Sequence, residues 1–225
     1  NGFHDTANTV ATSIATGAWG KKRAIAASAF LNFLGALMAV EVAKTIAGGI
    51  VDAQTVTTGV VFCALISAIA WNLLTWWWGQ PSSSSHALIG GLIGATLGHG
   101  GDVLWAKFAG SALIPMFVSP LLGVAGAFAI LQVLTHLKVS HKPWSQKFYK
   151  GAQLFSAGAL SVVHGMNDAQ KTMGIITLAL FAGGWSAGQL AVPLWVKITC
   201  AVVMGLGTAV GGWRIIKTLG YGITK

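Results

Sequence analysis

The chain has 225 residues, of which 54% are hydrophobic and only 8% are charged. Soluble domains carry about 25% charged residues, so this composition excludes an ordinary water-soluble domain and indicates a protein of the lipid bilayer. The formal net charge is +9 at pH 7, but the basic residues cluster in loops between apolar runs, which is typical of membrane proteins and predicts no nucleic-acid partner. Cys63 and Cys200 lie inside apolar runs and predict no disulfide framework.

The chain begins with a polar motif, NGFHDTANTVA, and a similar motif, HGMNDAQKTMG, returns at residues 164–174 within an apolar stretch. In the alignment of the two motifs, Gly2 matches Gly165, His4 matches Asn167, Asp5 matches Asp168 and Thr9 matches Thr172. The repetition shows that the first polar motif is not an isolated feature of the chain terminus.

Apolar runs long enough to cross about 30 Å of hydrocarbon as helices occupy residues 25–51, 55–78, 113–137 and 189–211. Basic side chains gather before the first run, after the third and after the fourth. We assign these loops to the cytoplasm, which leaves the loops that hold Asp52 and Asp102 outside. The sequence therefore predicts a multi-pass protein of the cell (inner) membrane, surrounded by lipid.

Residues 79–99, GQPSSSSHALIGGLIGATLGH, begin with a proline and four serines and continue with an apolar stretch too short for a full crossing helix. The charge pattern requires this segment to enter the membrane, so we expect its serine-rich part to be re-entrant and unwound. Non-helical backbone at that depth persists only where protein or a water-filled cavity surrounds it. We expect a second helix break near Asn167, between the two apolar halves of residues 151–183.

The same charge pattern orients the two polar motifs in opposite directions across the membrane. Inverted-topology repeats with interrupted helices at matching positions are typical of secondary transporters that bind substrate at the midplane. The predicted fold is therefore an all-α membrane protein, a polytopic helical bundle with inverted repeats and broken helices. Asn32 and Asn72 lie in apolar runs, and we interpret them as hydrogen-bonding between helices rather than as lining a path.

The chain has only five acidic residues. Two lie in the outside loops, and Glu41 lies near the end of an apolar run with Lys44 one turn away as a partner. Asp5 and Asp168 lie at equivalent positions of the repeat, inside membrane segments. Because an intramembrane carboxylate costs about 2.5 kcal/mol or more, we interpret this pair as functional rather than as helix caps.

The serine-rich segment offers hydroxyl donors followed by the start of a helix, which are features of an anion site. An anion next to a carboxylate is favoured if it carries a proton that the carboxylate can accept. Hydrogen phosphate has such a proton at neutral pH and sulfate does not. The sequence therefore favours phosphate as substrate, with sulfate or another oxyanion as the alternative, and the carboxylates can also hold a coupling cation or proton.

Four stretches of the chain resemble the inorganic phosphate transporter (Pit) family: NGFHDTANTVATSIATGA, PSSSSHALIGG, SVVHGMNDAQKTMGI and GTAVGGWRIIKTLG. The family's repeated pattern G-A-N-D-x-A-N matches residues 2–8 and 165–171, and its P-x-S-T-T-H loop matches residues 81–86. The resemblance implies that phosphate is bound between the repeats and that no cofactor is needed. The substrate-binding residues expected from it are Asp5, Thr9, Ser83, Ser84, Ser85, Asn167, Asp168 and Thr172.

Two residues depart from the family pattern, because His4 and Lys171 stand where the pattern has Asn. The lysine ammonium supplies a fixed positive charge where an amide would help to cage sodium, so we expect proton coupling, with sodium coupling as the alternative. His4 is a candidate proton relay. The residues expected to couple transport to the ion are His4, Asp5, Asn8, Asp168 and Lys171. The bacterial Pit branch is associated with neutral complexes of phosphate with a divalent metal, which stays open here, and we assign no metal ligand.

We expect residues 1–150 to form the first repeat, with the serine-rich loop and a cytoplasmic basic loop, and residues 151–225 to begin a second repeat. A second serine-rich loop is not found downstream, so the second repeat is predicted to be incomplete and the chain to be a fragment. Homo-oligomerisation is left open. A passive anion channel is a competing interpretation. An intramembrane hydrolase using Ser84 or Ser85 with His86 and Asp5 is another, but adjacent Ser and His rarely reach triad geometry, so we predict no enzyme.

Overall fold

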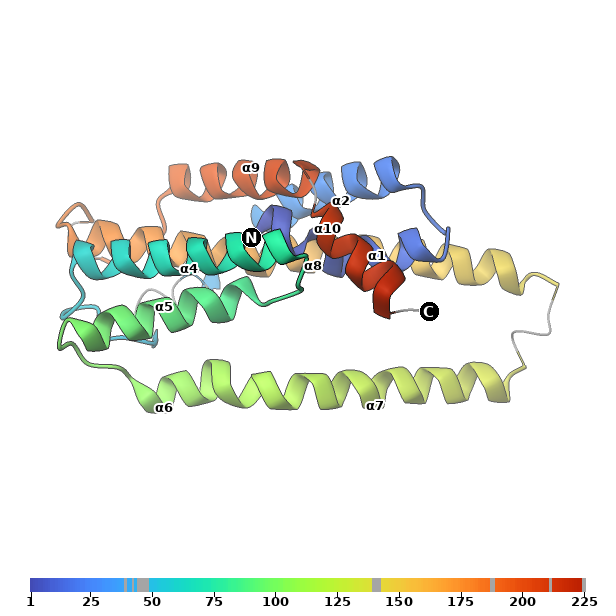
Figure 1. Cartoon of the computed structure of the whole chain (residues 1–225), viewed down its shortest axis with the longest axis horizontal. Coiled ribbons are helices and arrows are strands. Elements are labelled where there is room, and N and C mark those ends of the chain that lie inside the picture. The colour runs from blue at the N-terminus through green and yellow to red at the C-terminus, as the bar shows by residue number, and fades with distance from the viewer. Residues whose placement is uncertain are drawn as a thin grey trace.

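The computed structural model describes residues 1–38, 40, 41, 43, 49–138, 143–186, 189–210 and 212–223. These residues form helices joined by loops, together with an isolated bridge between Val51 and Val103 (Figure 1). The all-α fold class predicted from the sequence is confirmed. Lys44, the partner predicted for Glu41, lies outside the described residues.

The elements, in chain order, are α1 (Gly2–Ala15), α2 (Lys21–Ala36), α4 (Thr58–Trp78), α5 (Ser84–Gly98), α6 (Trp105–Phe108), the π-helix η1 (Ala109–Leu113), α7 (Ile114–His136), α8 (Ser145–Ala182), α9 (Leu194–Val210), α10 (Trp213–Lys217) and the π-helix η3 (Thr218–Ile223). Helices α2, α4, α7, α8 and α9 run along the long axis of the molecule, and α7 follows one side of the bundle (Figure 1).

Helices α2 and α8 approach each other closely at two glycines. Gly165 lies against the backbone of Asn32, and Gly35 lies against the backbone of Val162. A Cβ added at either glycine would overlap a carbonyl oxygen of the facing helix. Small residues allow such close approach between membrane helices, and here they bring the polar side chains of α2 next to those of α8.

Apolar side chains hold the remaining helices in place. Leu92 of α5 packs in one buried cluster with Val61 of α4 and Ile175 of α8. Val10 of α1 packs in another cluster with Ile216 of α10. The first of these contacts fixes α5, and with it the serine-rich segment that precedes it, against α4 and α8.

The second helix break predicted from the sequence, near Asn167, is wrong. Helix α8 runs without interruption over 38 residues, from Ser145 to Ala182. The charge of Asp168 is compensated within the helix, because the ammonium of Lys171 lies at i+3 on the same face. Alanine, methionine, glutamine and lysine around Asp168 also favour the helical backbone, so unwinding is not needed to satisfy the carboxylate.

The serine-rich segment begins without helical structure and then enters α5. The left-handed conformation of Gly79, with φ +68°, ends α4. Ser83 is extended, and its side chain accepts a hydrogen bond from the backbone N–H of His86, at 3.2 Å. This is the N-cap geometry that starts a helix, and it places the serine side chains at the N-terminal end of α5, where Ser84 is buried.

Among the described residues, two helical stretches are long and apolar enough to cross a membrane, namely Thr58–Trp78 and Trp105–His136. A third candidate combines Leu194–Val210 with Trp213–Tyr221, which are bent by 54° relative to each other. The apolar run 25–51 contributes the 16-residue helix α2 instead of one spanning helix. Composition therefore predicted more straight spans than are found in the described part of the chain, because it takes no account of where each helix ends.

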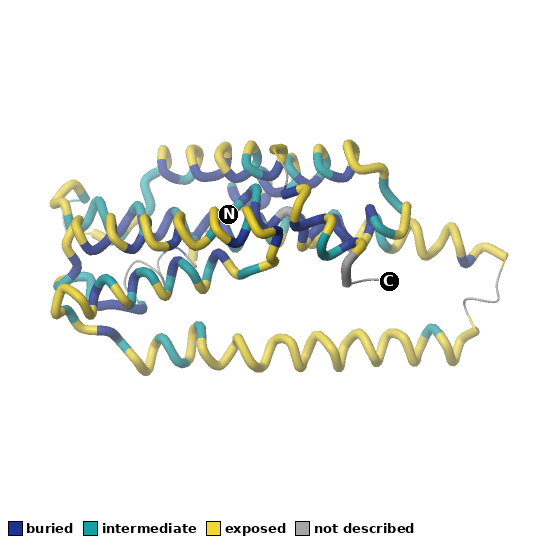
Figure 2. The backbone as a smooth tube through the Cα atoms, in the orientation of Figure 1, coloured by how far each residue is buried: buried dark blue, intermediate teal, exposed yellow. Residues whose placement is uncertain are grey.

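Helix α7 contains no buried residue, although it is one of the two spanning stretches (Figure 2). The loop before α6, which leads through η1 into α7, lies next to the loop before α4. The backbone N–H of Asp52 donates to the carbonyl of Asp102 at 3.2 Å, and that of Leu104 donates to the carbonyl of Ile50 at 2.9 Å. The two loops assigned to one membrane face are therefore neighbours.

Candidate functional site for an anion and a cation

Asp5 of α1 and Asp168 of α8 meet in the interior of the bundle. The two residues are 5% and 7% exposed. One carboxylate oxygen from each, together with a ring nitrogen of His164, lies within 4.8 Å of the others. Two buried carboxylates at this distance repel each other unless cations or protons compensate their charge, so the partners of each acid decide what the site can bind.

The partners of Asp5 come from α1, α4 and the serine-rich segment. Ser84 donates a hydrogen bond to Oδ2 of Asp5, and Nδ1 of His4 lies 3.1 Å from Oδ1. Nε2 of His4 lies 3.0 Å from Oγ1 of Thr75 on α4, which also accepts from Ser82 at 3.1 Å. His4 is therefore a buried link between the acid and α4.

The partner of Asp168 that carries a permanent charge is Lys171. Its Nζ contacts Oδ1 of Asp168 and also donates to Oγ of Ser85. The lysine therefore connects α8 to the serine-rich segment, and its ammonium stands between a carboxylate on one side and a hydroxyl on the other.

His164 is held by a hydrogen-bond chain from α2. Nδ2 of Asn32 donates to the carbonyl of Ser28 at 2.8 Å and to its hydroxyl at 3.1 Å. Oδ1 of Asn32 consequently faces Nδ1 of His164, at 2.7 Å, so Nδ1 carries the proton. In a neutral ring, the lone pair of Nε2 then points toward the acid pair. Nε2 lies 3.1 Å from Oδ2 of Asp168, but the two atoms do not form a hydrogen bond.

This geometry makes Asp5, His164 and Asp168 a candidate cation site. A donor set of one imidazole nitrogen and carboxylate oxygens suits divalent transition metals. The sequence motifs predicted no metal ligand, and His164 was not among the predicted site residues. His164 lies four residues before Asp168, which places both on one face of a helix. This spacing indicates His164 as a site residue only when the helix is continuous between the two. Asn32 was predicted to hydrogen-bond between helices, and its contact with His164 of α8 agrees with that prediction. The identity of its partner depends on how α2 packs against α8.

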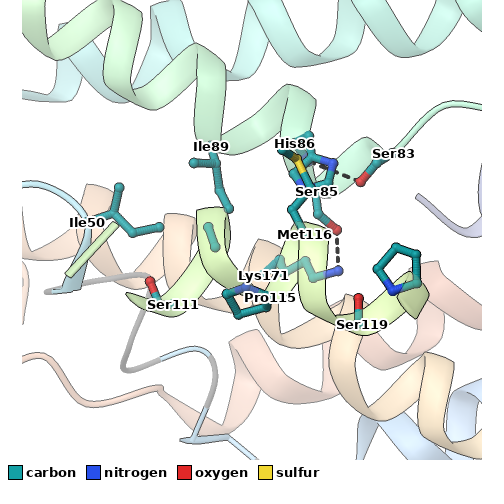
Figure 3. Close-up of a pocket in the computed structure, with 12 residues that line it drawn as sticks. Ile50, Ser83, Ser85, His86, Ile89, Ser111, Pro115, Met116, Ser119 and Lys171 are labelled. Carbon is teal, nitrogen blue, oxygen red and sulfur yellow. Dashed lines mark hydrogen bonds between the residues drawn. The ribbon is translucent and has the colours of Figure 1, made fainter. Parts of the chain in front are cut away.

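Two adjoining cavities surround the site. The acid cavity has a volume of about 370 Å³, and the acids and His164 lie in its wall. The α5/α7 cavity has a volume of about 430 Å³, and Lys171 lies in its wall (Figure 3). Ser83 and Ser85 line both cavities. The serine-rich segment therefore separates an acidic space from a basic one.

The other predicted site residues lie at different distances from the two cavities, and some line neither. Asn8 is exposed and lines the acid cavity. Thr9 is buried away from both cavities, and its hydroxyl lies 2.9 Å from that of Ser28 on α2. Thr172 lines a separate cavity of about 210 Å³ next to Asn1 and Asp168. Asn167 is half-buried and lines neither the acid cavity nor the α5/α7 cavity.

Apolar spanning helices around buried charges and hydroxyls define a helical membrane protein with an interior site for a charged solute, the class that includes secondary transporters. The chain belongs to the phosphate transporter family, whose family model matches residues 1–225. The resemblance identified from the sequence motifs is thereby confirmed.

Similar proteins carry names that agree with this assignment. A "probable low-affinity inorganic phosphate transporter" of Mycobacterium tuberculosis (strain CDC 1551 / Oshkosh) is 48% identical over 232 residues, which cover 100% of this chain and 55% of the relative. A protein of the same name from Bacillus subtilis (strain 168) is 43% identical, with 100% of this chain and 69% of the relative covered. The chain thus spans about half the length of the mycobacterial relative. The relatives are named as transporters, a non-enzymatic role.

A solved structure described as "the sodium-dependent phosphate transporter" has the same fold. It matches with a TM-score of 0.87 and covers 100% of this chain and 75% of that chain. The sequence identity is 22%, so this likeness concerns the fold alone.

Proposed function

We propose that this chain forms the substrate site of a secondary active transporter of inorganic phosphate in the cytoplasmic membrane. The observation that carries the proposal is the meeting of Asp5 and Asp168 next to Lys171 and the serine hydroxyls. Hydrogen phosphate matches this arrangement, because its oxygens accept from the ammonium and hydroxyl groups while its proton can be donated to a carboxylate. Membership of the phosphate transporter family supports the same substrate.

We further propose that transport is coupled to protons rather than to sodium. Lys171 contacts Asp168, and its ammonium already supplies the monovalent positive charge that a sodium ion would bring to this carboxylate. The direct experiment is phosphate uptake into proteoliposomes under an imposed pH gradient or an imposed sodium gradient. We expect uptake with the pH gradient alone. Uptake that requires sodium would overturn the coupling proposal and leave phosphate transport standing.

The substrate is tested in the same proteoliposomes. We expect excess unlabelled phosphate to suppress the uptake of labelled phosphate and excess sulfate to leave it unchanged. Equal suppression by sulfate would favour a general oxyanion transporter. A passive channel is distinguished by the lack of uptake against a phosphate concentration gradient.

A second candidate is that phosphate travels as a neutral complex with a divalent metal. The observation that favours it is the donor set of Asp5, His164 and Asp168, which is suited to such a metal. Uptake of labelled zinc or manganese should then require phosphate, with metal and phosphate entering in a fixed ratio. Phosphate uptake that is undiminished by removal of divalent metals contradicts this candidate.

We also propose that residues 1–150 form one repeat and that residues 151–225 begin a second repeat of opposite orientation. The two acid motifs face each other from α1 and α8, which supports this division. Impermeant maleimide applied to intact cells should label Asp52→Cys, in an outside loop, and should not label Lys147→Cys, at the end of α8 that is assigned to the cytoplasm. Cys63→Ala is included in both proteins because Cys63 is exposed. The reverse labelling pattern would refute the topology.

A further inference from the structure

We propose that the α5/α7 cavity is a second phosphate subsite, separate from the acid pair and anchored by Lys171. The inference deepens the proposed function and rests on it. Polar groups contributed to this cavity come from the serine-rich segment, from α7 with η1, and from α8. They are Ser83, Ser85, His86, Ser111, Ser119 and Lys171. Figure 3 shows the Lys171 side chain directed toward Ser85, with Ser119 of α7 across the same space.

The two cavities differ in the charge of the side chains that line them, so they favour different ligands. Asp5 and Asp168 line the acid cavity, whereas the described residues that line the α5/α7 cavity include no carboxylate. A phosphate dianion next to the acid pair is repelled unless a cation or proton is already bound, and next to Lys171 it is attracted. The anion therefore occupies the Lys171 side first, and it meets the acid pair only after a cation or proton has entered the acid cavity.

Helix α7 supplies the far wall of this subsite. The π-helix η1 and Pro115 and Pro120 interrupt regular α-helical hydrogen bonding along this stretch, and such π segments occur frequently at functional sites. Ser111 donates its hydroxyl to the carbonyl of Lys107 at 2.7 Å and offers its oxygen to the cavity. Ser119 places a second hydroxyl on the same wall, so α7 takes part in phosphate binding and not only in crossing the membrane.

Lys171 then couples the two cavities. Its ammonium contacts Asp168 and Ser85 together, so a phosphate in the α5/α7 cavity competes with Asp168 for the same charge. As the ammonium turns toward phosphate, Asp168 becomes available to a coupling cation. Because such linkage is reciprocal for binding free energies, the cation strengthens phosphate binding by the same factor.

Phosphate occupancy can be measured directly with Ser119→Cys in a Cys63→Ala background, purified in phosphatidylcholine nanodiscs. The rate of labelling by a negatively charged thiol reagent is recorded with and without inorganic phosphate. We expect phosphate to slow labelling of Ser119→Cys about tenfold at a concentration of about nine times its Kd, when roughly nine-tenths of the sites are occupied. Ala127→Cys, on α7 outside the cavity lining, is the matched control and should label at an unchanged rate.

Lipid phosphate groups share the chemistry of free phosphate, so the labelling is repeated in nanodiscs that contain phosphatidylglycerol. Protection by phosphatidylglycerol without added phosphate would overturn the proposal in favour of a lipid headgroup. The proposal would also be overturned if phosphate failed to slow the labelling of Ser119→Cys in both kinds of nanodisc.

Filling the cavity provides the functional readout. We expect Ala112→Phe, which introduces a large side chain into the cavity wall, to raise the KM for phosphate uptake about tenfold or more, equivalent to about 1.4 kcal/mol. Ala127→Phe should leave the KM unchanged. If the wild-type protein transports phosphate and Ala112→Phe does so with the same KM, the subsite is refuted while the proposed function stands. If the wild-type protein takes up no phosphate, both proposals fail.

Discussion

Carboxylate oxygens of Asp5 and Asp168 lie within 4.8 Å of each other, although Asp5 belongs to α1 and Asp168 to α8. Each acid has polar partners, because Ser84 and His4 contact Asp5 while Lys171 contacts Asp168. The two acids and their partners therefore depend on one another, and a single substitution changes what the remaining groups can bind.

Replacement of one acid tests the pair. Asp5→Asn keeps the shape of the side chain but removes a charge that accepts from Ser84. Hydrogen bonds to charged groups contribute about 1.5–3 kcal/mol, so we expect the initial rate of phosphate uptake to fall at least about tenfold. Asp102→Asn, in an exposed loop, is the matched control and should keep the wild-type rate. Equal rates of phosphate uptake in the two variants would show that Asp5 does not contribute to the site.

The second prediction concerns the positioning of His164. Asn32→Leu leaves Nδ1–H of His164 and the carbonyl of Ser28 without their side-chain partner, at a cost of about 1–3 kcal/mol. We expect lower thermal stability and phosphate uptake reduced about tenfold. Asn72→Leu is the control, because the buried Oδ1 of Asn72 has no hydrogen-bond partner among the described residues. Asn72→Leu should therefore be tolerated, and an equal loss in both variants would argue against a specific role for Asn32.

The third prediction concerns the contact between α2 and α8. Gly165→Ala places a methyl group against the backbone of Asn32, and overpacking of this kind costs about 1–3 kcal/mol. We expect a lower melting temperature in detergent. Gly158→Ala lies on the same helix, where the added Cβ would meet only Leu31 Cδ1 at 3.6 Å, so its melting temperature should be unchanged or higher. A stable Gly165→Ala protein would show that the helices can separate freely.

The fourth prediction concerns Thr9, which the sequence assigns to the substrate. In the structure its hydroxyl contacts Ser28, which also accepts from Ser161 at 3.0 Å. Thr9→Val removes this buried hydrogen bond, so we expect a loss of about 1 kcal/mol in the free energy of unfolding with an unchanged KM for phosphate. Thr9→Ser should restore the stability. A raised KM at normal stability would support the direct role in substrate binding.

The sequence by itself determined the membrane setting, the helical class, the serine-rich segment and the two acids that the structure brings together. These follow from local properties, because hydrophobicity, charge and motif repetition are written residue by residue. The cost of an intramembrane carboxylate made Asp5 and Asp168 stand out without any knowledge of their neighbours.

Tertiary structure alone decided that α8 is continuous, that Asn32 holds His164, that Thr9 contacts Ser28, and that Lys171 faces a cavity closed by α7. Each of these depends on side chains brought together from distant parts of the chain. Helix α8 passes Asp168 unbroken because the ammonium of Lys171 compensates its charge from the same helix. Asn32 reaches His164 because glycines let α2 and α8 approach. Packing, which no local pattern encodes, therefore decides which polar groups become partners.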